Sequence, residues 1–159
     1  MNKTGPILAG VALAGMALFA HAAVKFSATR EGFLELTNES FAIPLNDLGA
    51  TTVTFNLPAA KKVLLTYTAV CAVSGSSGTQ DPRVHLDIVV NNSTVAPTRG
   101  NRDIFCSGNH TSIADAYATH TISTAISGKK GANTVMVIGG RLGAAGYVSI
   151  GNSSLVISD

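Results

Sequence analysis

The chain has 159 residues, of which 13% are charged, and its formal net charge at pH 7 is +2. Its basic residues are scattered apart from the pairs Lys61-Lys62 and Lys129-Lys130. This scatter argues against a nucleic-acid-binding protein, which requires clustered basic residues interleaved with aromatic side chains. The low charge and the abundance of Gly, Ser, Thr, Val and Ala favour exported β-structure over a soluble helical protein.

The first 22 residues have the pattern of a secretory signal peptide. Lys3 gives a positive start, an apolar run extends from Ile7 to Ala20, and Ala20-His21-Ala22 has the small-x-small form of a cleavage site. The run of about 14 residues is too short to span a bilayer, and no later segment is long enough. We therefore expect a signal peptide over residues 1–22, one domain over residues 23–159, and a secreted, periplasmic or extracellular protein without a membrane span.

Short segments of alternating apolar and polar residues predict β-strands throughout the rest of the chain. Asn91-Asn92 and several Gly-rich segments supply the turns between them. The predicted strands cover residues 51–56, 63–73, 83–90, 94–96, 117–126, 134–138, 147–150 and 154–158, with one or two more between residues 26 and 43. Eight to ten short antiparallel strands are typical of an all-β sandwich or barrel.

Two cysteines, Cys71 and Cys106, lie outside the signal peptide. In an oxidising compartment two cysteines are expected to form one disulfide. The closed loop of about 35 residues would stabilise the fold by roughly 3–4 kcal/mol through chain entropy. We expect residues 97–111 to be a long irregular loop that this disulfide ties to the core strand of Cys71.

The residues after Pro97 form the candidate binding loop, because polar and charged side chains on a long loop commonly carry function. Its members are Arg99, Arg102, Asp103, His110 and Asp115. Ser107 or Ser112, with His110 and Asp103, has the residue types of a hydrolase, but neither serine has a nucleophile-elbow context. We therefore expect a protein that is not an enzyme.

No cofactor is predicted, with calcium as the alternative. Asp81, Asp103 and Asp115 have suitable carboxylates, but the spacing of a calcium-binding loop is absent. His85 and Asp87 share one strand face. A row of solvated polar side chains is a simpler interpretation of this spacing than a pair of metal ligands.

Aromatic side chains for a sugar-binding surface are few. The chain has no Trp and three Tyr residues. Tyr67 is expected to point into the core, and Tyr117 is a second candidate for a core position. Tyr147 is therefore the best candidate for an exposed ring.

Two late strands are apolar on both faces, at residues 135–138 and 155–157. A two-layer sandwich buries only one face of each sheet. The second apolar face therefore needs a cover, either another subunit or ligand, or loops of the same chain.

Several segments in order carry a resemblance to a known group. They are Lys61-Lys62, residues 63–71, residues 84–92, residues 96–98, residues 103–106 and residues 152–157. Over residues 30–159 the chain resembles exported bacterial β-sandwich domains with the pattern of C1q/TNF-like jelly rolls. The resemblance implies a two-sheet jelly roll of about ten strands that forms homo-oligomers, often trimers, and acts as a recognition or adhesion head.

The function expected from these observations is non-catalytic binding by a homo-oligomer. The expected partners are a second copy of the chain and an extracellular ligand, either a glycan or a protein. Two alternatives remain: a structural envelope or matrix protein that forms filaments through its sheet edges, and a small secreted hydrolase.

Overall fold

The structure is a computed structural model that describes residues 23–37, 40–75, 83–96, 104–107, 117–142 and 146–159. These residues form ten β-strands and no helix. The strands are β1 (Val24–Glu35), β2 (Phe41–Ala42), β3 (Thr52–Leu57), β4 (Lys61–Gly75), β5 (Arg83–Val90), β6 (Ser93–Ala96), β7 (Ile104–Ser107), β8 (Tyr117–Gly128), β9 (Gly131–Leu142) and β10 (Gly146–Ser158). Within this part of the chain there is no helix of the length and apolarity that a membrane crossing needs.

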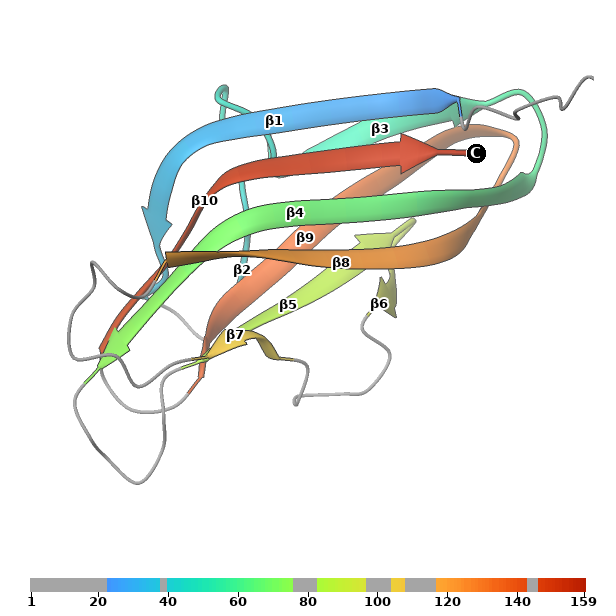
Figure 1. The fold of residues 1–159 in the computed structure, drawn as a ribbon. Helices are drawn as coiled ribbons and strands as arrows, with labels where there is room; N and C mark the ends of the chain where they lie inside the picture. The colour runs from blue at the N-terminus through green and yellow to red at the C-terminus, as the bar shows by residue number, and fades with distance from the viewer. Residues whose placement is uncertain (1–22, 38–39, 76–82, 97–103, 108–116, 143–145) are drawn as a thin grey trace, which may run out of the picture.

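The strands form two antiparallel sheets that pack face to face (Figure 1). The four-stranded sheet has the order β1-β10-β4-β8, and the six-stranded sheet has the order β2-β9-β5-β6, with β3 also paired to β9 and β7 also paired to β5. When β2 and β3 are counted as one position and β6 and β7 as another, each sheet has four positions, and their order in the two sheets is that of a jelly roll. The predicted all-β jelly-roll sandwich is confirmed.

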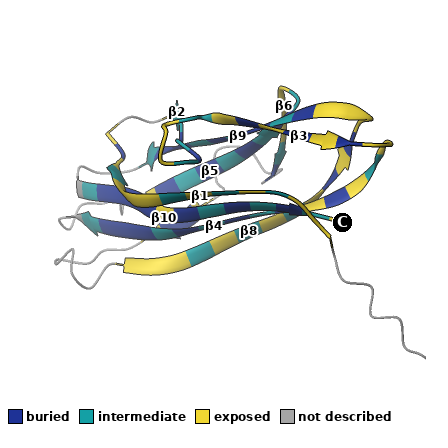
Figure 2. Cartoon of the chain, turned by 90° about the horizontal axis from the view of Figure 1, so that it is seen from above, coloured by how far each residue is buried: buried dark blue, intermediate teal, exposed yellow. Residues whose placement is uncertain are grey.

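Alternation of buried residues with more exposed ones along the strands places the core between the two sheets (Figure 2). In β5, residues Val84, Leu86 and Ile88 are fully buried, whereas the residues between them are not. In β4 every second residue from Val63 to Val73 is buried, as the sequence predicts. Burial of about 25 cal/mol per Å² of apolar surface is the main force that holds the two layers together.

The outward residues of the strands with two apolar faces are half-buried. Met136 and Ile138 on β9 and Val156 on β10 lie in this class, whereas Val135, Val137 and Leu155 are fully in the core. Neighbouring side chains on the same sheet face thus remove part of the apolar surface from water within one chain.

Two sequence-based boundaries are wrong because strand pairing overrides local glycine signals. Residues 147–150 and 154–158 belong to one strand, β10, and the predicted turn at Gly151-Asn152 is a bulge at which the register with β4 shifts. Asn152 adopts a positive φ of 45° there. Likewise β9 continues to Leu142 through Gly139 and Gly140, because both glycines pair with β5.

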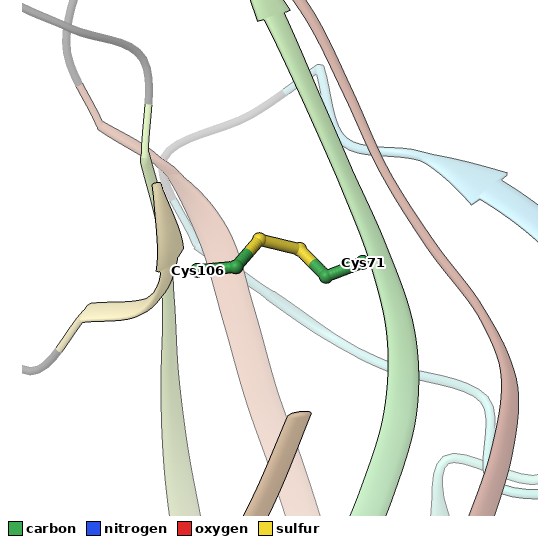
Figure 3. Close-up of a disulfide and its surroundings, with 2 residues drawn as sticks. All are labelled: Cys71 and Cys106. Carbon is green, nitrogen blue, oxygen red and sulfur yellow. A yellow bond between two sulfur atoms is a disulfide. The ribbon is translucent and has the colours of Figure 1, made fainter. Parts of the chain in front are cut away.

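The predicted irregular loop over residues 97–111 contains a strand. Ile104–Ser107 form β7, which pairs with the edge of β5. Cys106 on β7 is bonded to Cys71 on β4, with 6.4 Å between their Cα atoms (Figure 3). The predicted disulfide is confirmed, and it joins the two sheets rather than tying an irregular loop to the core.

The two ends of the sandwich differ in their connections. At one end, here called the turn end, β3 leads into β4 and β8 leads into β9 through short turns (Figure 1). At the other end, here called the loop end, β4 finishes and β8 and β10 begin. The disulfide lies towards the loop end, since Cys71 is in register with Ala118 near the start of β8.

Hydrogen bonds of asparagine side chains hold the turn end together. Asn133 is fully buried. Its Oδ1 accepts hydrogen bonds from the Lys129 backbone N–H at 2.9 Å and from Asn91 Nδ2 at 3.0 Å. Its Nδ2 donates to the carbonyls of Lys129 and Gly131 at 2.8 and 3.0 Å. Asn91 and Asn92 both have positive φ, which confirms the turn predicted there.

Candidate binding site

The charged residues of the predicted binding loop fall outside the part of the chain that the structure describes. Arg99, Arg102, Asp103, His110 and Asp115 all lie outside the described residues. Among the described residues no three His, Cys, Asp or Glu side chains gather in a group that could hold a metal ion. His85 and Asp87 are half-buried on the outer face of the six-stranded sheet. The candidate site must therefore be sought on the strands themselves.

Two aromatic rings meet on the outer face of the four-stranded sheet, towards the loop end. Phe33 on β1 and Tyr117 on β8 have ring centroids 5.1 Å apart and planes inclined at 75°. Their side chains remain 43% and 44% exposed. These two residues, called the aromatic pair below, come from opposite edges of the sheet.

The register shows how two edge strands can share a contact. Phe33, Gly151, Val70 and Thr119 form one row across the sheet, and Glu35, Ser149, Ala72 and Tyr117 form the next. Neighbouring strands are about 4.8 Å apart, so β1 and β8 are separated by roughly 14 Å. Rings that meet at 5.1 Å must therefore both reach inward over the middle strands β10 and β4.

Small residues beneath the rings make this arrangement possible. A Cβ atom at Gly151 would collide with the backbone carbonyl oxygen of Gly32 and would lie 2.8 Å from both Cα and Cδ1 of Phe33, so glycine is needed for β1 and its ring to lie this close. Ala72 is fully buried although it lies on the outer face of its strand. Three of the four positions between the edge strands in these rows thus carry small residues, and the fourth is Val70.

A bulge in β1 positions Phe33. The register with β10 shifts between Arg30 and Phe33, and Gly32 there has a φ of +74° that favours glycine. The Gly32 N–H donates to Asn152 Oδ1 at 3.0 Å, and the Glu31 N–H donates to Asp47 Oδ1 at 2.8 Å. Each backbone N–H that the bulge removes from the ladder therefore has a side-chain acceptor.

Ser149 is an unsatisfied polar group in this part of the sheet. Val148 and Ile150 point into the core, so Ser149 points to the outer face, in the same row as Tyr117. It is fully buried, and its hydroxyl has no hydrogen-bond partner within the described part of the chain. A buried polar group without a partner costs about 1–3 kcal/mol.

Hydroxyl groups continue the outer face beyond the aromatic pair. The next two rows are Thr29, Ser154, Thr68 and Thr121, then Ser27, Val156, Thr66 and Ser123. Two cross-strand pairs are hydrogen-bonded, Thr68 with Thr121 at 3.0 Å and Thr66 with Ser123 at 3.1 Å. Neither row contains a charged side chain, and the four bonded hydroxyls are already paired with one another.

The tyrosines are not distributed as the sequence suggests. Tyr67 is fully buried, as predicted, and burial raises the pKa of its phenol, whereas Ser153 and Arg30 act in the opposite direction. Tyr117 is exposed rather than part of the core, and Tyr147 is half-buried rather than the most exposed. Phe33 was not predicted as a surface residue, although the Glu31-Gly32 segment before it signals a bulge.

Comparisons with known proteins give the chain no family. No family model matches it, and no curated protein matches it. Among solved structures, a family 35 carbohydrate binding module from an environmental isolate aligns at 16% identity and a TM-score of 0.37, over 82% of this chain and 91% of that one. Eiger TNF from S. frugiperda aligns at 11% identity and a TM-score of 0.42, over 84% of this chain and 90% of that one.

A third solved structure is dimeric latent PorU from Porphyromonas gingivalis, which aligns at 10% identity and a TM-score of 0.42, over 87% of this chain and 13% of that one. Alignments at these TM-scores carry no argument about function. The jelly-roll assignment therefore rests on the strand order of this chain, and its function must be inferred from its own surface.

Proposed function

We propose that this protein is an exported, non-catalytic binding or adhesion domain that acts as a homo-oligomer and binds an extracellular glycan at the aromatic pair. The observation that carries the proposal is the meeting of two half-exposed rings on a sheet face that otherwise presents mainly hydroxyls and small side chains. Exposed aromatic rings in contact mark a surface that gains free energy when a ligand covers it.

A sugar ring matches the chemistry of this surface. Its C–H faces pack on aromatic rings, and its hydroxyls both donate and accept hydrogen bonds. Phe33 and Tyr117 supply the apolar contact, while Thr119 lies in the adjacent row position with a hydroxyl directed outward.

The test is binding to a glycan array by the unmodified protein and by Phe33→Ala and Tyr117→Ala. We expect both substitutions to reduce the signal on the bound glycans by at least about tenfold, because a buried aromatic contact contributes more than 1.4 kcal/mol. Ile104→Ala is the matched control, since Ile104 is equally exposed, at 44%, on the outer face of the other sheet. Glycan binding that survives both ring substitutions, or a protein that binds no glycan, would contradict the proposal.

A further inference from the structure

One long edge of the four-stranded sheet has no strand beside it among the described residues. β8 pairs with β4 on one side only and ends the sheet order. Its 12 residues, YATHTISTAISG, contain no Lys, Arg, Asp, Glu or Pro. An edge of this kind presents a row of unpaired backbone N–H and C=O groups that can accept a further strand.

The opposite edge of the same sheet carries the features that prevent such pairing. β1 also has 12 residues, but it includes Lys25, Arg30, Glu31 and Glu35. It is interrupted by the bulge before Phe33, where two backbone N–H groups already bond to side chains. Charges and bulges are the usual protection of an edge strand, and β8 has neither.

The edges of the six-stranded sheet are shorter. β2, β3, β6 and β7 have 2, 6, 4 and 4 residues, so each offers at most half the ladder that β8 offers. Within the described part of the chain, β8 is therefore the longest uncharged edge.

We propose that two copies of this chain pair antiparallel through β8, in a register centred on Ile122, and so join their four-stranded sheets into one sheet of eight strands. The proposal rests on the homo-oligomeric part of the proposed function. The two copies are related by a two-fold axis that crosses the β8–β8 pair. The outer faces of both sheets lie on the same side only if this axis passes opposite a residue. If it passed between two residues, each inward side chain would lie opposite an outward one. Ile122 and Ser123 are the two central residues of β8.

The Ile122 register gives the better side-chain pairs. It places the half-buried Ile122 opposite its own copy, whereas the alternative places Ser123 opposite itself. Apolar β-branched pairs across strands contribute more than pairs of small polar residues. In the same register Thr121 lies opposite Ser123, and His120 lies opposite Thr124, so no like charges face each other.

This pairing also explains why assembly would stop at two copies. Each chain uses the one long edge that is unprotected among its described strands, and the new outer edges of the joined sheet are the two protected β1 strands. Growth into a filament would need a second open edge of comparable length. A closed two-fold dimer therefore replaces both the filament and the trimer among the assemblies considered from the sequence.

The dimer would make the proposed glycan site bivalent. The two-fold axis keeps both outer faces on one side, so both aromatic pairs would lie on one continuous surface. Tyr117 of each copy lies ten positions along β8 from the partner's Tyr117, or about 34 Å at about 3.4 Å per residue. Two sites at this spacing on one rigid face favour polymeric or surface-bound glycans, with an avidity gain of about 10²-fold or more.

The mass of the protein in solution tests the pairing. Light scattering at micromolar concentration should give twice the chain mass for the unmodified protein and for Ser27→Lys combined with Thr29→Lys on the protected edge. Ser123→Lys combined with Ala125→Lys should halve the mass without unfolding the protein, as judged by circular dichroism. A monomeric or trimeric unmodified protein, or equal disruption by both pairs of substitutions, would overturn the proposal.

A cross-linking experiment tests the register. A mixture of Thr121→Cys and Ser123→Cys chains should form an intermolecular disulfide in higher yield than either chain alone, because these positions face each other only between different variants. Equal yields in all three samples would contradict the Ile122 register.

Binding separates this proposal from the proposed function. The monomeric variant should keep its affinity for a soluble monovalent glycan from the array and lose about 10²-fold on the immobilised form. A dimer that binds no glycan would refute the glycan site and leave the β8 pairing intact.

Discussion

The two ends of the sandwich differ in how their buried polar groups are hydrogen-bonded. At the turn end every polar atom of the buried Asn133 side chain has a protein partner. Towards the loop end, the equally buried Ser149 hydroxyl has no partner among the described residues, and two aromatic rings remain nearly half exposed. The turn end thus satisfies its buried polar group within the chain, whereas the loop end leaves aromatic surface exposed, and the proposed function assigns that surface to a ligand.

Removal of the disulfide, which lies towards the loop end, is expected to have the largest effect on the free energy of unfolding. Cys71→Ser combined with Cys106→Ser should lower the free energy of unfolding by about 3–4 kcal/mol, because it frees a loop with a sequence separation of 35 residues in the unfolded state. Chemical denaturation under non-reducing conditions measures the loss. A loss below about 1 kcal/mol would show that the loop end is held together by its noncovalent contacts instead.

The asparagine cluster comes next. Asn133→Ala should cost about 2–3 kcal/mol, because it removes a fully buried amide that bonds the Lys129 N–H, the carbonyls of Lys129 and Gly131, and the Asn91 side chain. Asn56→Ala is the control, since Asn56 is exposed on β3. Equal denaturation midpoints for the two variants would refute a structural role for the turn end.

The smallest effect is expected at Asp159, which pairs with Lys61 and with Lys25, the latter at 3.2 Å. The hydrogen bond from Lys61 is the main cause that holds the pKa of this carboxyl below its usual 3.8, with Lys25 contributing further. The pair therefore stabilises the fold above that value, and its contribution is lost as the pH falls through the lower pKa of the folded state.

Asp159→Asn should thus lower the unfolding temperature slightly at pH 7 and low salt, with no difference in strong acid. Thermal unfolding across pH measures this effect. A difference that grows towards acid pH would contradict the assigned sign, and one that is insensitive to salt would contradict a surface ion pair.

Local alternation was sufficient to predict most of the fold. The core faces of β3, β4 and β5, the Asn91-Asn92 turn and the Cys71–Cys106 bond all follow from patterns within a few residues or from the compartment. The strand at Ile104–Ser107 was missed because its pairing with β5 outweighs a weak local signal. Glycine and asparagine favour both a bulge and a turn, so the local sequence at residues 151–152 does not distinguish the β10 bulge from a turn.

The aromatic pair could not be predicted from local pattern. Phe33 and Tyr117 are brought together only by the register of four strands and by the bulges at Gly32 and Asn152. A shift of one residue in any of these pairings would send one ring to the opposite face. The charged loop predicted as the binding surface lies outside the described residues, so it stays a prediction.

The most direct test of the contrast between the two ends is a map of backbone amide chemical shifts during titration with a glycan identified on the array. The account predicts that the shifts gather at Phe33, Thr119, Ser149 and Gly151, while Asn91 and Asn133 at the turn end stay unchanged. Shifts confined to the turn end or to the six-stranded sheet would contradict the assignment of the binding surface.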